Sequence, residues 1–163
     1  MNTVDTFKSE LMNWLRECGF NDVKNLDFAI DFAYNIPDHK IHIGVQRYPE
    51  VSEWFVEFLD EYGFMFEDVP EPVLCFLHEL GHNQTIYNFS DETLQFLAFR
   101  KNFTLSEGKE GMMAYWTLDD ELAANKWLID WTSNHIDEFF ALCSIYSTCW
   151  NAMVDEVNVF DLI

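Results

Sequence analysis

The pattern of hydrophobic positions changes period along the N-terminal part of the chain. Apolar residues recur every three or four positions over residues 3–18 and a glycine follows, which predicts an amphipathic helix. Over residues 26–36 large apolar residues alternate with small or polar ones, which predicts a half-buried strand. A second alternating run, residues 41–45, follows the Pro37-Asp38 turn signal. The two runs therefore predict a β-hairpin with residues 35–40 as its loop.

The helical period dominates the rest of the chain. One amphipathic run begins at Pro49 and stops before Gly63. Residues 73–81 are apolar nearly all round, which is typical of a buried helix. The order of elements predicts one α+β domain over residues 1–163, in which a small N-terminal sheet packs on a mostly helical part. The remaining expectations are a short strand at 64–69, a helix at 91–103 capped by Ser90 or Asp91, a loop at 104–111, and helices at 118–132 and 135–156.

Composition narrows the class of protein. Apolar residues make up 49% of the chain and aromatic residues 17%, which excludes intrinsic disorder. The chain has 29 acidic and 9 basic residues and a formal net charge of −20. Such acidity argues against direct binding of nucleic acid or of an anionic membrane surface. It leaves a soluble protein with basic partners, or an acidic mimic of a nucleic acid.

The expected location is the cytoplasm. The N-terminus lacks a basic region followed by an apolar run, and no stretch of 18 apolar residues occurs. The chain contains four cysteines and no CxxC pair, and each cysteine has apolar neighbours. We interpret them as reduced, buried thiols: Cys18, Cys75, Cys143 and Cys149.

The run His78-Glu79-Leu80-Gly81-His82, inside the predicted buried helix, matches the HExxH pattern. Residues four apart share one face of a helix, so both imidazoles can reach the same ion. Glu79 lies one position round, where it can act as a general base on water. Polar side chains in a buried helix are costly unless partners satisfy them, which favours a metal site over a pair of hydrogen-bonded core histidines.

A catalytic zinc site with an open position for water needs a third protein ligand. The metzincin pattern would place glycine at position 85 and histidine at position 88, where this chain has Thr85 and Asn88. The gluzincin pattern instead takes a glutamate from a later helix, with a polar residue four positions on that braces a ligand histidine. Of the glutamates after the motif, Glu121 alone has a suitable residue there, Asn125. His135, at a predicted helix start, remains an alternative ligand.

These two segments, HELGH at 78–82 and ELAANKW at 121–127, resemble the ImmA/IrrE-type zinc peptidases. The resemblance covers about 60 residues, from Val73 to Trp131, and implies a minimal zincin-like fold of the gluzincin type. Members of that family cleave or destabilise transcriptional repressors of phages and mobile elements, which is therefore the role that the resemblance implies. The small residues Ala123 and Ala124 would let the two metal-bearing helices approach closely.

The sequence thus predicts a zinc metallopeptidase acting on a protein or peptide, with a basic substrate favoured by the acidic surface. His78, His82 and Glu121 would bind Zn²⁺, Glu79 would be the general base, and Asn125 would brace a ligand. Two other classes remain open. One is a nucleic-acid mimic, and the other is a zinc-stabilised interaction domain without turnover.

Substrate binding has its own candidates. An exposed edge strand, residues 40–47, would pair with an extended substrate by β-addition. Tyr87, Tyr115 and His135 are candidate donors to a tetrahedral oxyanion, although packing is the favoured interpretation for each. His42 alternates with its apolar neighbours on the predicted strand and is expected at the surface.

Overall fold

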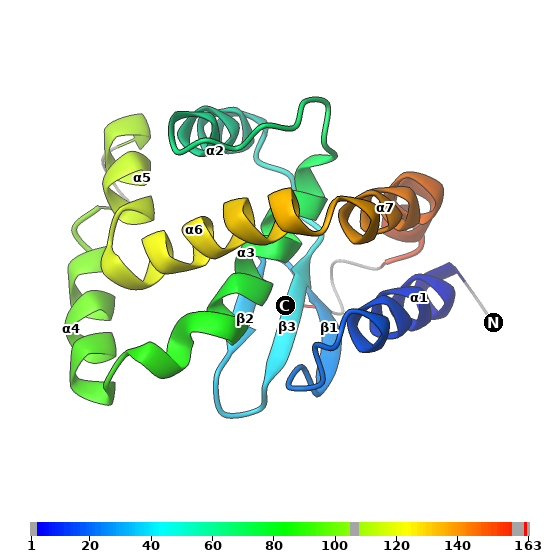
Figure 1. Ribbon diagram of the computed structural model, residues 1–163, viewed down its shortest axis with the longest axis horizontal. Helices are drawn as coiled ribbons and strands as arrows, with labels where there is room; N and C mark the ends of the chain where they lie inside the picture. The colour runs from blue at the N-terminus through cyan, green and yellow to red at the C-terminus, as the bar shows by residue number, and fades with distance from the viewer. Residues whose placement is uncertain (1–2, 105–107, 158–161, 163) are drawn as a thin grey trace.

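A computed structural model describes residues 3–104, 108–157 and 162 of the chain. Within them the α+β class is confirmed: seven α-helices and a short 3-10 helix accompany a three-stranded sheet (Figure 1). Helix α3 lies between the sheet and helix α6. In chain order the elements are α1 (Thr3–Glu17), β1 (Asn25–Ala29), β2 (Ala33–Asn35), β3 (Lys40–Gly44), α2 (Pro49–Glu61), α3 (Glu71–Thr85), η1 (Ile86–Asn88), α4 (Asp91–Lys101), α5 (Gly108–Trp116), α6 (Asp119–Asn134) and α7 (Ile136–Glu156).

The sheet has the order β1-β3-β2, which corrects the prediction of one continuous strand over residues 26–36. β2 and β3 form the expected antiparallel hairpin, but β1 pairs with β3 in parallel on its other side. Residues 30–32, which connect β1 to β2, pass over the end of β3 at Gly44. An ideal Cβ on Gly44 would lie 2.4 Å from the backbone nitrogen of Phe32, so only glycine fits under the crossing. The alternation of apolar residues continues without interruption over residues 26–36, so the sequence pattern does not reveal that β1 and β2 are separate strands.

Because β3 has a neighbour on each side, the prediction that residues 40–47 form an edge strand is wrong. The backbone of the following residues also stays engaged on the β1 side: the amides of Val45 and Gln46 donate to the carbonyls of Ala29 and Ile30. His42 is half-buried in β3.

The helix signals in the sequence are largely confirmed. Pro49 is the first residue of α2, and Gly63 follows that helix with a φ of +98°, in the left-handed region that favours glycine. The Ser90 hydroxyl caps α4 by accepting a hydrogen bond from the Thr93 amide. Residues 64–69 form a loop rather than a strand. Helix α5 begins inside the predicted loop 104–111, of which residues 105–107 lie outside the described residues.

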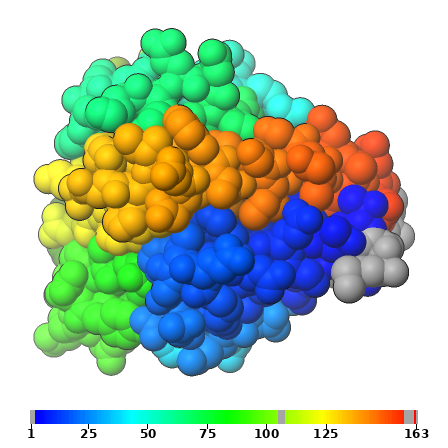
Figure 2. Space-filling view, turned by 45° about the vertical axis from the view of Figure 1, so that its right-hand side comes forward, coloured from blue at the N-terminus to red at the C-terminus, as the bar shows by residue number. Residues whose placement is uncertain are grey.

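The hydrophobic core joins α1, α3, α7 and the sheet. α1 lies beside α6 and α7 on one face of the molecule (Figure 2). The indole nitrogen of Trp14 donates to the carbonyl of Glu138, 2.8 Å away, and fixes α1 to α7. Phe76, fully buried on α3, contacts the aromatic rings of Trp14 and Tyr146. Among the described residues no helix is long and apolar enough to cross a bilayer.

Candidate metal centre

The site forms where α3 and α6 cross at close range. Gly81, in the middle of the HELGH segment, lies against Ala124 of α6. A Cβ added to Gly81 would lie 2.6 Å from the carbonyl oxygen and 3.0 Å from the Cα atom of Ala124. The approach predicted from the small residues is therefore confirmed at Ala124, which is fully buried. It brings the polar side chains of the two helices together in the interior.

Three of the predicted residues converge at this crossing. One carboxylate oxygen of Glu121, Oε2, lies 2.7 Å from Nε2 of His78 and 2.8 Å from Nε2 of His82. The potential ligand atoms of the three side chains all lie within 4.8 Å of one another. All three residues are buried, at 8%, 8% and 3% relative exposure. This buried His78/His82/Glu121 group could hold a metal ion.

Asn125 occupies the bracing position predicted for it. Its Oδ1 accepts a hydrogen bond from Nδ1 of His78 over 2.7 Å, and its Nδ2 lies 3.4 Å from the carbonyl of Trp116. Because the amide oxygen only accepts, His78 must carry a proton on Nδ1. Once Nε2 loses its proton, His78 offers the lone pair of that nitrogen to an ion, which is the tautomer that a metal ligand requires.

Lys101 is a member of the site that the sequence analysis missed. Its ammonium lies 3.0 Å from Oε1 of Glu121 and 2.6 Å from Oδ2 of Asp120, and its side chain is 20% exposed. The other oxygen of Asp120 is buried without a hydrogen-bond partner among the described residues. In the sequence Lys101 is an ordinary cation in the last turn of a helix, where the helix dipole favours positive charge, so no local signal marks it.

The charges in the site stabilise one another. Burial would lower the pKa of the His78 imidazole, but the charge and hydrogen bond of Glu121 raise that pKa to about 9. Burial would raise the pKa of the Glu121 carboxyl, but His82 and His78 hold it well below its usual range. Burial would lower the pKa of Lys101, and Glu121 and Asp120 raise it instead. Glu121 is therefore an anion and Lys101 a cation near neutral pH.

Glu79 and Tyr115 face the same region from different helices. Burial raises the pKa of the Glu79 carboxyl, with the two histidines opposing the shift, which is the direction expected of a general base near neutral pH. Tyr115 on α5 lines the same groove, and burial followed by the charge of Glu121 raises the pKa of its phenol, so the hydroxyl keeps its proton. Glu79 is not one of the three grouped residues.

The other candidates lie elsewhere. The ring of His135 stacks on Trp131 at 4.7 Å, and its Nδ1 donates to the carbonyl of the same residue over 2.9 Å. His135 is not part of the grouped ligands, and Tyr87 is 62% exposed. Of the three candidate oxyanion donors, Tyr115 is the one in contact with the site. The four cysteines are free thiols; Cys149 is buried and the others are half-buried.

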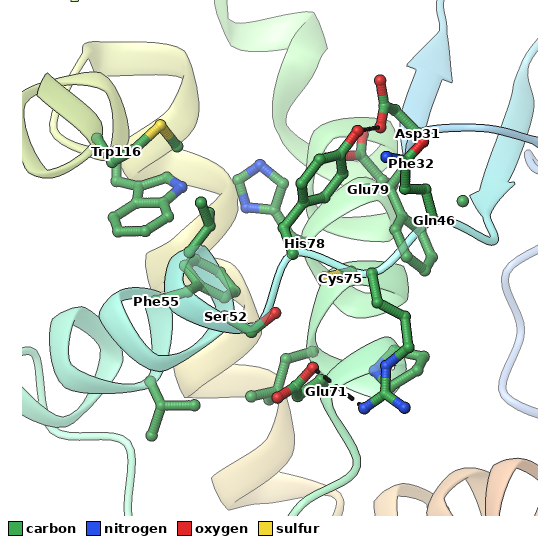
Figure 3. A pocket seen from close by; sticks show the side chains of 18 of the residues that line it. Asp31, Phe32, Gln46, Ser52, Phe55, Glu71, Cys75, His78, Glu79 and Trp116 are labelled. Atoms are coloured by element: carbon green, nitrogen blue, oxygen red, sulfur yellow. Dashed lines mark hydrogen bonds and ion pairs between the residues drawn. The ribbon is translucent and has the colours of Figure 1, made fainter. Parts of the chain in front are cut away.

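A groove of about 250 Å³ leads to the site between α2, α3 and α5 (Figure 3). His78 lines the part of it close to Phe55 and Trp116, and Glu79 lies on the side of Asp31 and Phe32. The Phe55 ring lies 5.8 Å from the His78 ring, edge to face, and 5.0 Å from the Trp116 ring. The His78/His82/Glu121 group is therefore buried, but it adjoins a groove that is open to solvent.

Comparisons of the chain with protein-family models, with curated proteins and with solved structures found no match. The chemistry of the site consequently rests on its own donor set. Two imidazole nitrogens and one carboxylate oxygen suit a transition-metal ion, since imidazole binds zinc, copper, iron and nickel.

Proposed function

We propose that the protein is a zinc-dependent peptidase. The observation that carries the proposal is that His78, His82 and Glu121 converge beside Glu79 at the end of an open groove. Two imidazoles and one carboxylate are a ligand set of catalytic zinc sites, in which a further position is open to water. The HELGH and ELAANKW segments support a minimal zincin-like fold of the ImmA/IrrE type, which is part of the same proposal.

Each side chain has a chemical task in this proposal. Zinc bound by the three ligands would supply a Lewis acid that activates water and polarises a peptide carbonyl. Glu79 accepts the proton of the attacking water and passes it to the leaving amine. Asn125 keeps His78 in the tautomer that offers Nε2. The Tyr115 hydroxyl, which keeps its proton, donates a hydrogen bond to the oxyanion.

The partner in this proposal is a cytoplasmic protein or peptide with basic residues. The formal charge of −20 favours a cationic substrate through complementary potentials. A repressor encoded by a phage or another mobile element is the substrate class that the family resemblance implies.

Substitution of the base tests the proposal. Glu79→Gln keeps size and hydrogen bonding but cannot accept a proton, so turnover of the natural partner should fall by about 10²–10⁴. Metal content should not change, because Glu79 is not a ligand. Glu53→Gln on α2 is the matched control, since it makes the same substitution at an exposed residue that does not line the groove. Cleavage should be measured together with elemental analysis of each protein.

The two other classes give different results in that experiment. If the protein is a nucleic-acid mimic, its effect should survive Glu79→Gln and weaken in about 1 M salt, where the Debye length is roughly 3 Å. If it is a zinc-stabilised interaction domain, the metal should be retained and the partner should stay uncleaved by wild type. Either result would contradict the peptidase proposal.

A further inference from the structure

We propose that the groove binds a large apolar side chain, leucine, methionine or phenylalanine, of the substrate residue next to the bond that is cut. The cleavage of that bond rests on the proposed peptidase function, whereas the binding of the side chain does not. The walls, the size and the position of the groove determine which side chain it accepts.

The walls of the groove are mainly apolar. α2 contributes Phe55, α5 contributes Met112 and Trp116, and α3 contributes Leu74 to the floor. Cys75 lies on the same floor one turn before Glu79, and burial raises the pKa of its thiol to about 12, so it remains neutral. An apolar guest here would exchange water for aromatic and aliphatic contacts.

Charged groups lie toward the ends of the groove. Arg47 pairs with Glu71 over 3.9 Å, eight residues before Glu79 on α3, which corresponds to about 12 Å along the helix axis (Figure 3). The Tyr48 hydroxyl donates to Asp31 over 2.7 Å at the rim. With no charge on the walls between, a buried lysine or glutamate side chain would lose its hydration without gaining a partner.

Size selects among apolar side chains. A cavity of about 150 Å³ is enough for benzene, so the groove volume of about 250 Å³ accommodates a leucine, methionine or phenylalanine side chain and leaves a methyl group with few contacts. The groove is accessible from solvent, because Tyr48 and Val56 at its lining are 45% and 36% exposed. Since it also contains His78 and Glu79, a side chain bound there belongs to a residue beside the reacting carbonyl.

Methyl NMR tests the binding without requiring catalysis. Protein labelled on the methionine methyl groups is titrated with N-acetyl-phenylalaninamide and, separately, with N-acetyl-alaninamide. The phenylalanine probe should shift the Met112 methyl signal through its ring current, and the alanine probe should not. Loss of the signal in Met112→Leu assigns it, and Met12 and Met153, which do not line the groove, serve as internal references.

Filling the groove gives the matched control. Ser52 on α2 lines the groove, whereas its neighbour Glu53 does not and is exposed. Ser52→Trp should abolish the Met112 shift, and Glu53→Trp should leave it intact, with unchanged metal content in both. Val56→Trp at the exposed mouth is a second filling variant if Ser52→Trp fails to fold. Equal shifts from the two probes, or a shift that persists in a folded filling variant, would overturn the proposal.

A second measurement separates this inference from the peptidase function. In a set of basic peptides that differ at one position, kcat/KM should be about tenfold or more higher with phenylalanine or leucine than with glycine, and Ser52→Trp should remove the difference. If peptides are cleaved without this preference, the inference fails while the peptidase function stands. If the phenylalanine probe binds and nothing is cleaved, the groove is a binding site and the peptidase function fails.

Discussion

At the scale of single residues, Glu121 divides its two carboxylate oxygens between two tasks. Oε2 lies between the imidazoles of His78 and His82, and Oε1 lies against the ammonium of Lys101. The lysine therefore leaves Glu121 with one oxygen for an ion. The motif spacing predicted the first task. It could not predict the second, because Lys101 comes from a helix whose sequence carries no pattern linking it to the site.

The first prediction concerns the ranking of ligands. Glu121→Ala should remove a direct ligand and weaken zinc binding strongly, whereas Asn125→Ala should weaken it by roughly 10–100-fold, the usual effect of a residue that orients a ligand. Competition with a chelator of known affinity measures both. If His135→Ala abolished binding and Glu121→Ala did not, the ligand assignment would be wrong.

A second prediction follows from the buried charges around Lys101. Lys101→Met leaves Glu121 and Asp120 without a cation, so the metal-free protein should lose about 3 kcal/mol of unfolding free energy, near the lower end for breaking a buried ion pair. Zinc places positive charge beside Glu121, so the loss should be smaller in the loaded protein. Denaturant unfolding with and without zinc measures the difference.

Lys101→Arg is the control for that prediction, because it keeps the positive charge and should retain most of the stability. An equal loss for Lys101→Met in metal-free and zinc-loaded protein would show that the lysine and the ion do not share Glu121.

At the scale of elements, periodicity predicted most helices and missed what depends on long-range contacts. The apolar stripes and stop signals located α1, α2, α3, α6 and α7 because each of these helices buries one face or lies in the core, and the cap at Ser90 located α4. The break between β1 and β2 is imposed by the crossing at Gly44, which leaves the alternation of residues 26–36 unchanged. Helix α5 was hidden by the glycines at positions 108 and 111, and with it the Tyr115 and Trp116 walls of the site.

The close crossing of α3 and α6 predicts whether Gly81→Ala stabilises or destabilises the protein. In an exposed helix Gly→Ala stabilises by roughly 0.5–1 kcal/mol. At Gly81 the added methyl group would meet the backbone of Ala124, so Gly81→Ala should instead destabilise by about 1–3 kcal/mol and weaken metal binding. Thermal unfolding and metal titration measure the two effects. A stabilised protein with normal metal binding would contradict the close crossing.

At the scale of the whole molecule, the site is assembled from helices that are far apart in the sequence. α3 and α6 supply the His78/His82/Glu121 group, α4 supplies Lys101, and α5 with α2 forms the groove wall. The sequence could identify the members that share a helix face with fixed spacing. It could not identify Lys101 or the groove-wall residues of α2 and α5, because no local sequence pattern indicates a contact that only the tertiary fold creates.

The central claim is that the buried group holds a zinc ion, and elemental analysis tests it most directly. Protein purified without added metal should contain about one equivalent of zinc per chain, and His78→Ala and His82→Ala should contain none while keeping their helical circular dichroism. Folded wild-type protein that contains no zinc, and that takes up none when zinc is supplied, would contradict the account.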